Sequence, residues 1–214
     1  MVAVSYESLG VALRVATVVV PVAVYFLLLG LLNSRRHPQL LTGQQDFVLL
    51  MVALCPLFVL PILGAVGVSP ASVLVVGAAM AGAFYLLAPK GRNWVIYNMP
   101  VQEAKATIAE VIGSLGAACL ETNDGLSLPD ENATIQIGGF PMLRNVTVRV
   151  RGGGKDFLRR FQAALDGRLA SIPAQTSPAA VSLLLVATAL LVVPVTLMVH
   201  RVPEIVRILT DLLH

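Results

Sequence analysis

The sequence predicts an α-helical integral membrane protein with four transmembrane helices and an inserted α+β sandwich domain, and three observations lead to this fold class. Of the 214 residues, 57% are apolar and 13% are charged, whereas about 25% are charged in a typical soluble domain. Four long stretches contain no charged residue. A polar segment with mixed strand and helix patterns separates the third stretch from the fourth. We therefore expect lipid to cover most of the apolar surface.

The first three transmembrane helices are expected within residues 1–89, and the first of them spans about 11–32. Its uncharged run from Val15 to Leu32 has the length that a helix needs to cross a bilayer. The run is too long for a signal peptide and lacks a small-residue cleavage pattern. We therefore expect it to be a retained anchor.

The second and third helices are expected over 47–67 and 70–89, inside one continuous uncharged stretch. Residues 67–70, Gly-Val-Ser-Pro, have the composition of a tight turn between them. A re-entrant pair is the alternative, since Pro56 and Pro61 would break a helix in water. In lipid, neighbouring helices satisfy the freed carbonyl groups, so two full spans are the preferred interpretation.

The fourth helix is expected over 176–200, and a shorter segment, 201–214, follows it. The shorter segment has apolar residues on one helical face and cannot span a bilayer. An amphipathic helix on the outer leaflet is the simplest interpretation, and docking against a partner subunit is the alternative.

The polar segment 90–175 predicts the α+β domain, with the order β-α-β-β-β-α and a roughly ferredoxin-like arrangement. Strand patterns occur at 93–97, at 117–121 and 126–128 around an Asn-Asp-Gly hairpin turn, at 133–137 and at 145–150. A helix is expected to begin at Pro100 and to end at Gly116. Its apolar face consists of Ala104, Ile108, Val111, Ile112 and Leu115. A second helix carries Phe157, Leu158, Phe161, Leu165 and Leu169 on one face.

The distribution of Lys and Arg near the span ends predicts the orientation. The 33–46 loop and the 90–175 domain carry most of these residues and are expected in the cytoplasm. Both termini would then face outward. The composition, rich in Ala, Val, Gly and Arg, suggests a bacterial inner (plasma) membrane, so the outer side would be the periplasm. Trp94 and Tyr85 are expected to anchor the inner face.

The segment Gly152-Gly153-Gly154-Lys155 is the motif that comes nearest to a phosphate-binding turn. A P-loop requires glycine at the position of Arg149 and Ser or Thr at the position of Asp156. Neither requirement is met, so we expect a flexible turn between strand and helix, with Asp156 as the helix cap. No nucleotide site is predicted.

Basic residues form two groups. A solvated face is the first interpretation of the larger group, and contact with anionic lipid headgroups or a partner is the alternative for both groups. The first is a cluster in the polar domain, formed by Arg144, Arg149, Arg151, Lys155, Arg159 and Arg160. The aromatic residue within this cluster, Phe157, belongs to the apolar helix face named above and is not expected to stack on bases, which argues against nucleic acid. The second group, Arg35 and Arg36, is explained first as a topology determinant. Asp46 is expected to pair with one of these two arginines.

Several sequence features argue against catalysis, cofactors and metals. The uncharged stretches that form the spans, 15–32, 47–89 and 179–199, contain no Asp, Glu, Lys, Arg or His, although such residues usually mark proton relays and ion coupling. The three histidines fall on both sides of the membrane, and Cys55 and Cys119 are read as reduced. No GxSxG, HExxH or CxxC pattern occurs. We therefore predict no catalytic residue, no cofactor and no metal site.

The third span contains overlapping small-xxx-small pairs, which allow close helix packing: Gly77, Ala78, Ala81 and Gly82. We therefore predict a non-catalytic accessory or assembly subunit of a bacterial inner-membrane complex, with a cytoplasmic protein-interaction domain. Its partners would be lipids and other membrane subunits or further copies of the chain. The first alternative is a membrane-tethered sensor whose 90–175 domain binds a small ligand or nucleotide, and the second is an oligomeric channel or carrier.

Overall fold

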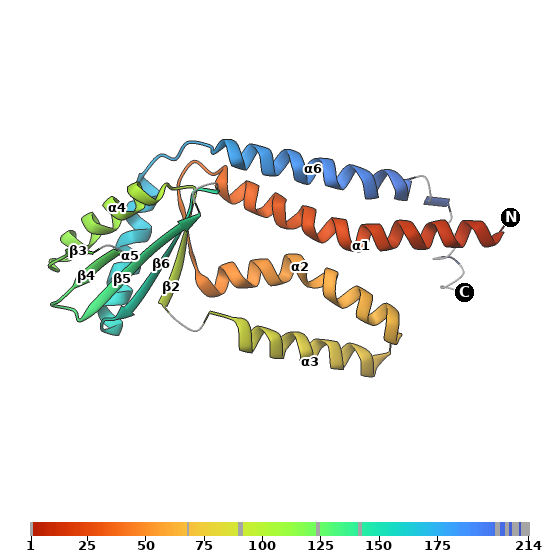
Figure 1. Cartoon of the computed structure of the whole chain (residues 1–214), viewed down its shortest axis with the longest axis horizontal. Coiled ribbons are helices and arrows are strands. Elements are labelled where there is room, and N and C mark those ends of the chain that lie inside the picture. Colours follow the sequence, from red (N-terminus) through yellow and green to blue (C-terminus); the bar gives the residue numbers. More distant parts are fainter. Residues whose placement is uncertain are drawn as a thin grey trace.

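The structure is a computed structural model, and it describes residues 2–67, 69–89, 92–122, 125–140, 143–199, 202–203, 206 and 210. Four long helices extend in one direction from a unit of sheet and shorter helices (Figure 1). The N-terminus lies at the end of the helices remote from the sheet (Figure 1). Most of the expected helix 201–214, the residues at 123–124 and Val68 lie outside the described residues.

The four long helices are α1 (Val2–Asn33), α2 (Gly43–Val66), α3 (Pro70–Leu87) and α6 (Pro178–Val199). Each contains a segment long and apolar enough to cross a membrane, and these segments are Arg14–Asn33, Gly43–Val66, Pro70–Leu87 and Pro178–Leu197. The predicted second and third spans are therefore two separate helices of spanning length. α2 continues through Pro56 and Pro61.

The helices α2 and α3 begin at residues whose side chains satisfy the free N–H groups of the first turn. Thr42 and Gln45 form a capping box at the start of α2, and Ser69 and Ser72 form one at the start of α3. Near the sheet, the rings of Phe47 and Phe84 are 5.7 Å apart and join the two helices.

The helices α1 and α6 run antiparallel, side by side (Figure 1), and small residues bring them close. Ala16, Ala23 and Gly30 recur at heptad spacing on α1 and are buried. Ala180 and Ala187 recur at the same spacing on α6 and have no exposed surface. A Cβ placed on Gly30 would lie 2.8 Å from two side-chain carbons of Leu184. This small-residue contact is absent from the sequence prediction, which considered only α3.

The sheet has six strands, each antiparallel to its neighbours, in the order β1-β2-β6-β5-β4-β3. The strands are β1 (Gln39–Thr42), β2 (Arg92–Tyr97), β3 (Leu120–Thr122), β4 (Gly125–Leu128), β5 (Ala133–Phe140) and β6 (Asn145–Gly152). β1 comes from the loop between α1 and α2, and it pairs with β2 from Gln39↔Tyr97 to Thr42↔Trp94. The sheet therefore includes a strand that the sequence analysis did not anticipate.

Two helices, α4 (Val101–Ser114) and α5 (Lys155–Ser171), pack on one face of the sheet around a single core. The predicted apolar faces are confirmed, because their residues are buried or packed against the core. Trp94 is also in this core, and its ring meets Phe161 edge-on with the centroids 6.0 Å apart. The expectation that Trp94 anchors the protein at a membrane surface is therefore wrong.

Three further details differ from the sequence prediction. Four strands follow α4, one more than in the expected order, because the two arms of the predicted hairpin are separate strands. All four precede α5, whereas a ferredoxin-like chain has its second helix before its last strand. Gly154, not Asp156, is the N-cap of α5, and this cap has no side-chain hydrogen bond. Asp156 lies in the first turn, where its charge complements the helix dipole.

Candidate functional site

The small residues of α3 lie on a face that the described part of the chain leaves uncovered. Gly77, Ala78, Ala81 and Gly82 are all exposed, and a Cβ added at either glycine would have no atom within 4 Å. α3 approaches α2 with Ser72 and Val76, which are buried. At 100° per residue these two positions lie on the side of α3 opposite the small residues.

The face of the sheet opposite α4 and α5 carries part of the predicted basic cluster. Arg149 and Arg151 alternate along β6 with the buried Val148 and Val150, so they point to this open face. Arg149 lies next to Gln136 of β5 in register. These two side chains, with Thr147, line a shallow cavity of about 280 Å³.

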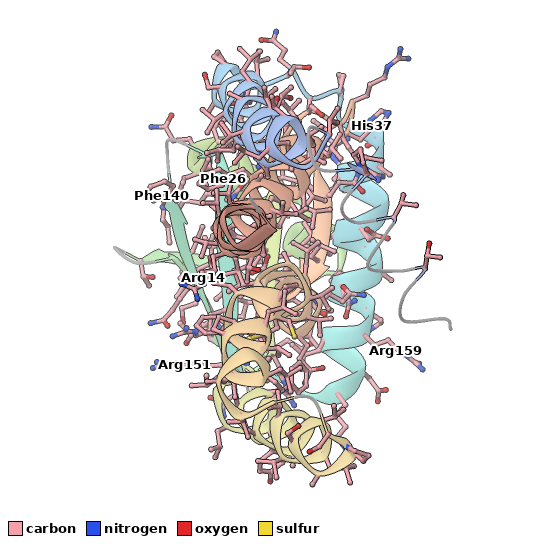
Figure 2. The ribbon with its side chains drawn as sticks, turned by 90° about the vertical axis from the view of Figure 1, so that its right-hand side faces the viewer. Arg14, Phe26, His37, Phe140, Arg151 and Arg159 are labelled. Atoms are coloured by element: carbon pink, nitrogen blue, oxygen red, sulfur yellow. The ribbon has the colours of Figure 1, made fainter. Side chains whose placement is uncertain are left out.

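The other basic residues of the predicted cluster lie elsewhere. Lys155, Arg159 and Arg160 are exposed on α5, which covers the opposite face of the sheet. In Figure 2, Arg151 and Arg159 lie on opposite sides of the molecule. The six residues therefore lie on separate surfaces, because β6 belongs to the sheet and α5 belongs to the layer of helices on its other face.

The glycine turn between β6 and α5 is held by an arginine. Arg92 Nη1 donates hydrogen bonds to the carbonyl oxygens of Gly152 and Gly153, at 2.6 and 2.8 Å. The N–H of Gly153 donates to the carbonyl of Asn132. A phosphate-binding turn points its N–H groups toward the anion, whereas here the carbonyl groups face a guanidinium group. This geometry agrees with the expected role of a turn between strand and helix.

Residues 35–37, just after α1, are joined to the α+β unit and the α5–α6 linker by hydrogen bonds to main-chain carbonyl groups. The carbonyl of Arg35 accepts from Asn98 Nδ2 at 2.9 Å, and the carbonyl of Arg36 accepts from the N–H of Ala174 at 2.7 Å. His37 Nδ1 lies 3.1 Å from the carbonyl oxygen of Ile172. The side chains of Arg35 and Arg36 are exposed. Contact of these side chains with lipid phosphates or partner carboxylates stays a prediction.

Asp46 has a partner different from the one expected. Its carboxylate accepts a hydrogen bond from the hydroxyl of Tyr97, the last residue of β2, and not from Arg35 or Arg36. Tyr97 is buried, and burial is the main reason why its pKa is raised above the ordinary value of 10.0. The hydrogen bond to Asp46 raises the pKa further, because ionisation would place two negative charges together.

A polar cavity of about 190 Å³ lies where the long helices meet the α+β unit. Its walls come from the loop after α1, the end of β2, the first turn of α4, the turn before β6 and the α5–α6 linker: Pro38, Asn98, Glu103, Arg144, Ile172, Pro173, Ala174 and Gln175. Arg144 was predicted only as a member of the basic cluster. Asn98 and Glu103 carried no sequence signal, because the cavity exists only after distant segments come together.

Among the described residues, no group of three or more His, Cys, Asp or Glu side chains is arranged to hold a metal ion. Cys55 and Cys119 are both free thiols. Comparisons of the chain with protein-family models, with curated proteins and with solved structures found no match.

Proposed function

We propose that the chain is a non-catalytic accessory or assembly subunit of a membrane complex. The observation that carries this proposal is the uncovered small-residue face of α3. In lipid, apolar burial does not drive helix association, and small residues promote it by letting backbones approach closely. Within the chain, small residues allow the close contact between α1 and α6. The small-residue face of α3 would form a contact of the same kind with a helix of another subunit or another copy.

The proposal places the four apolar helices across a bacterial inner membrane, the α+β unit in the cytoplasm and both termini in the periplasm. Two observations support this topology. The first is the bias of Lys and Arg toward the 33–46 loop and the 90–175 segment. The second is the pairing of β1 with β2, which requires both segments to lie on the same side of a membrane.

The α+β unit would contribute a protein-binding surface. Its open sheet face presents Arg149 and Arg151 to solvent. An acidic partner surface would complement these charges, since complementary potentials steer association and suppress wrong partners.

Co-purification of the full chain from its native membrane tests the docking role of α3. The variants Ala78→Leu and Ala81→Leu add bulk to the small-residue face, and Ala189→Leu adds the same bulk at an exposed position of α6. We expect a discrete assembly for the unmodified chain and for Ala189→Leu, and loss of the partner in the other two variants. A monodisperse single chain without a partner would contradict the proposal.

Cysteine accessibility tests the orientation separately. In a background with Cys55→Ala and Cys119→Ala, the thiol introduced by Asp124→Cys should react with an externally added impermeant maleimide only after the membrane is permeabilised. Labelling of position 124 from the periplasmic side in intact cells would overturn the proposed topology.

The second candidate function is a membrane-tethered sensor, and the cavity beside Arg149 favours it. Thermal unfolding of the full chain with and without nucleotides separates it from the subunit role. A ligand present at 100 times its Kd should stabilise the chain by about 2.7 kcal/mol. Identical unfolding curves with and without nucleotides would contradict the sensor role and favour the subunit role.

A further inference from the structure

Two of the residues that line the polar cavity at the junction, Asn98 and Arg144, each have one buried side-chain atom without a hydrogen-bond partner. Asn98 is 1% exposed, its N–H donates to Asn33 and its Nδ2 donates to the carbonyl of Arg35. Its Oδ1 accepts from no described group. Arg144 Nε is the second such atom. A buried donor or acceptor left without a partner is costly, so such atoms indicate where a ligand would be held.

Two opposite charges also line this cavity without pairing. Arg144 contributes a guanidinium group and Glu103 a carboxylate. Among the described residues the salt bridges are Lys105–Glu121 and Arg168–Glu110, so Arg144 and Glu103 do not form one with each other. The residues that line the cavity therefore include a cationic donor, Arg144, an anionic acceptor, Glu103, and a neutral acceptor, Asn98.

The size and position of the cavity restrict the ligand. Its volume of about 190 Å³ is below the range of about 300–1,000 Å³ that drug-sized ligands occupy, which disfavours a nucleotide. Pro38 lies shortly after the end of α1, and Gln175 lies shortly before the start of α6. If these helices span a bilayer, the cavity lies at the depth of the headgroups, which extend several ångströms beyond the hydrocarbon core.

We propose that this cavity binds a phosphoethanolamine group, with its phosphate on Arg144 and its primary ammonium on Asn98 Oδ1 and Glu103. A guanidinium group is a strong phosphate ligand. A primary ammonium carries three N–H donors, which match the free amide oxygen and the carboxylate. The group is the headgroup of phosphatidylethanolamine, and free phosphoethanolamine has the same chemistry.

This chemistry predicts discrimination between lipids. A trimethylammonium group has no N–H to donate, so phosphatidylcholine would leave Asn98 Oδ1 without a partner. Phosphatidylglycerol would bring no cation to Glu103. We therefore expect phosphatidylethanolamine to bind about tenfold more tightly than either lipid, the factor that a charged hydrogen bond supports.

Native mass spectrometry of the full chain, released from vesicles containing equal amounts of the three lipids, measures this preference. Glu103→Gln should reduce the preference for phosphatidylethanolamine over phosphatidylcholine severalfold, while Arg144→Gln should weaken retention of both. The matched controls are Glu110→Gln, on the same helix as Glu103, and Arg159→Gln, on the outer face of α5. Glu103 is exposed, so its variant is expected to fold even if Arg144→Gln does not.

Free phosphoethanolamine, added as a competitor, identifies the source of the group. Displacement of the lipid at matched concentration would indicate the free compound, and retention of the lipid would indicate the membrane headgroup. Equal binding of the three lipids to the unmodified chain would overturn the proposal, as would a Glu103→Gln variant that behaves like Glu110→Gln. The inference rests on the membrane placement proposed above. Co-flotation of the unmodified chain with vesicles tests that placement separately.

Discussion

The side-chain Oδ1 of Asn33 accepts a hydrogen bond from the backbone N–H of Asn98, at 3.1 Å. Asn33 is the last residue of α1 and Asn98 follows the last residue of β2, so this bond joins the first long helix directly to the sheet. Both residues are 1% exposed. Asn33 Nδ2 also donates to the carbonyl of Leu29, which fixes the orientation of the amide.

Replacement of Asn33 by Ala should lower the free energy of unfolding by about 1–3 kcal/mol, because it leaves the buried N–H of Asn98 without an acceptor. Denaturation in detergent measures the change, with Trp94 fluorescence as the signal, since Trp94 is the single tryptophan and lies in the core. Ser34→Ala is the control, since the hydrogen bond that the Ser34 hydroxyl donates is local, to the carbonyl of Leu31. Equal stability of the two variants would contradict the assigned role of Asn33.

Replacement of Tyr97 by Phe should change how stability depends on alkaline pH. The pKa of Tyr97 is raised in the folded chain, so its contribution is fully present below the ordinary pKa of 10.0. As the pH rises above that value, the unfolded state loses the phenolic proton more readily, and stability falls. The unmodified chain should therefore lose stability more steeply above pH 10 than the variant, as measured by denaturation across this range.

The hydrogen bond between Tyr97 and Asp46 can be isolated by a double-mutant cycle. Tyr97→Phe and Asp46→Ala should each destabilise the chain, and their combination should cost less than the sum. A coupling free energy of about 1.5–3 kcal/mol at neutral pH is typical of a hydrogen bond to a charged group. Additive effects would show that the two residues do not interact in solution.

Replacement of Gly30 by Leu should separate α1 from α6. The new side chain would overlap Leu184, and its Cβ would lie 3.3 Å from the carbonyl oxygen of Ala180. Overpacking of this kind costs about 1–3 kcal/mol, which thermal unfolding in detergent would detect by circular dichroism. Gly64→Leu is the matched control on α2, since a Cβ there meets nothing within 4 Å. A shift of equal size in both variants would disprove the close contact.

Replacement of Gly152 by Ala should destabilise the turn between β6 and α5. Gly152 has φ 77°, and a Cβ there would lie 2.1 Å from the backbone oxygen of Asn132. We expect a loss of at least about 2 kcal/mol from this strain and clash. Gly154→Ala should stay within about 1 kcal/mol of the unmodified chain, since Gly154 has φ −70° and a Cβ there meets no atom within 4 Å. Equal losses would contradict the backbone geometry of Gly152.

The helices and most strands could be predicted because their signals are local. The buried faces of α4 and α5 repeat at helical spacing, and Val146, Val148 and Val150 alternate with polar residues along β6. The strand β1 could not be predicted in this way. Gln39–Thr42 is short and carries no alternating pattern, and it is a strand because β2 offers it a hydrogen-bonding edge.

The candidate sites were predicted less completely than the fold. The small residues of α3 and the exposed Arg35, Arg36, Arg149 and Arg151 were identified from composition and charge. The junction cavity was not identified, because Asn98, Glu103 and Arg144 lie in three separate segments with no common motif.

The sequence by itself determined four apolar helices and the core-facing residues of an α+β unit, since both depend on hydrophobicity over short distances along the chain. Only the tertiary structure decided which helices pack together, with Gly30 against Leu184 and the small face of α3 uncovered. It also decided that Tyr97 bonds to Asp46, and that Asn33 joins α1 to the sheet. These contacts connect residues far apart in the chain, and their partners are selected by packing and by the need of buried polar groups for hydrogen bonds.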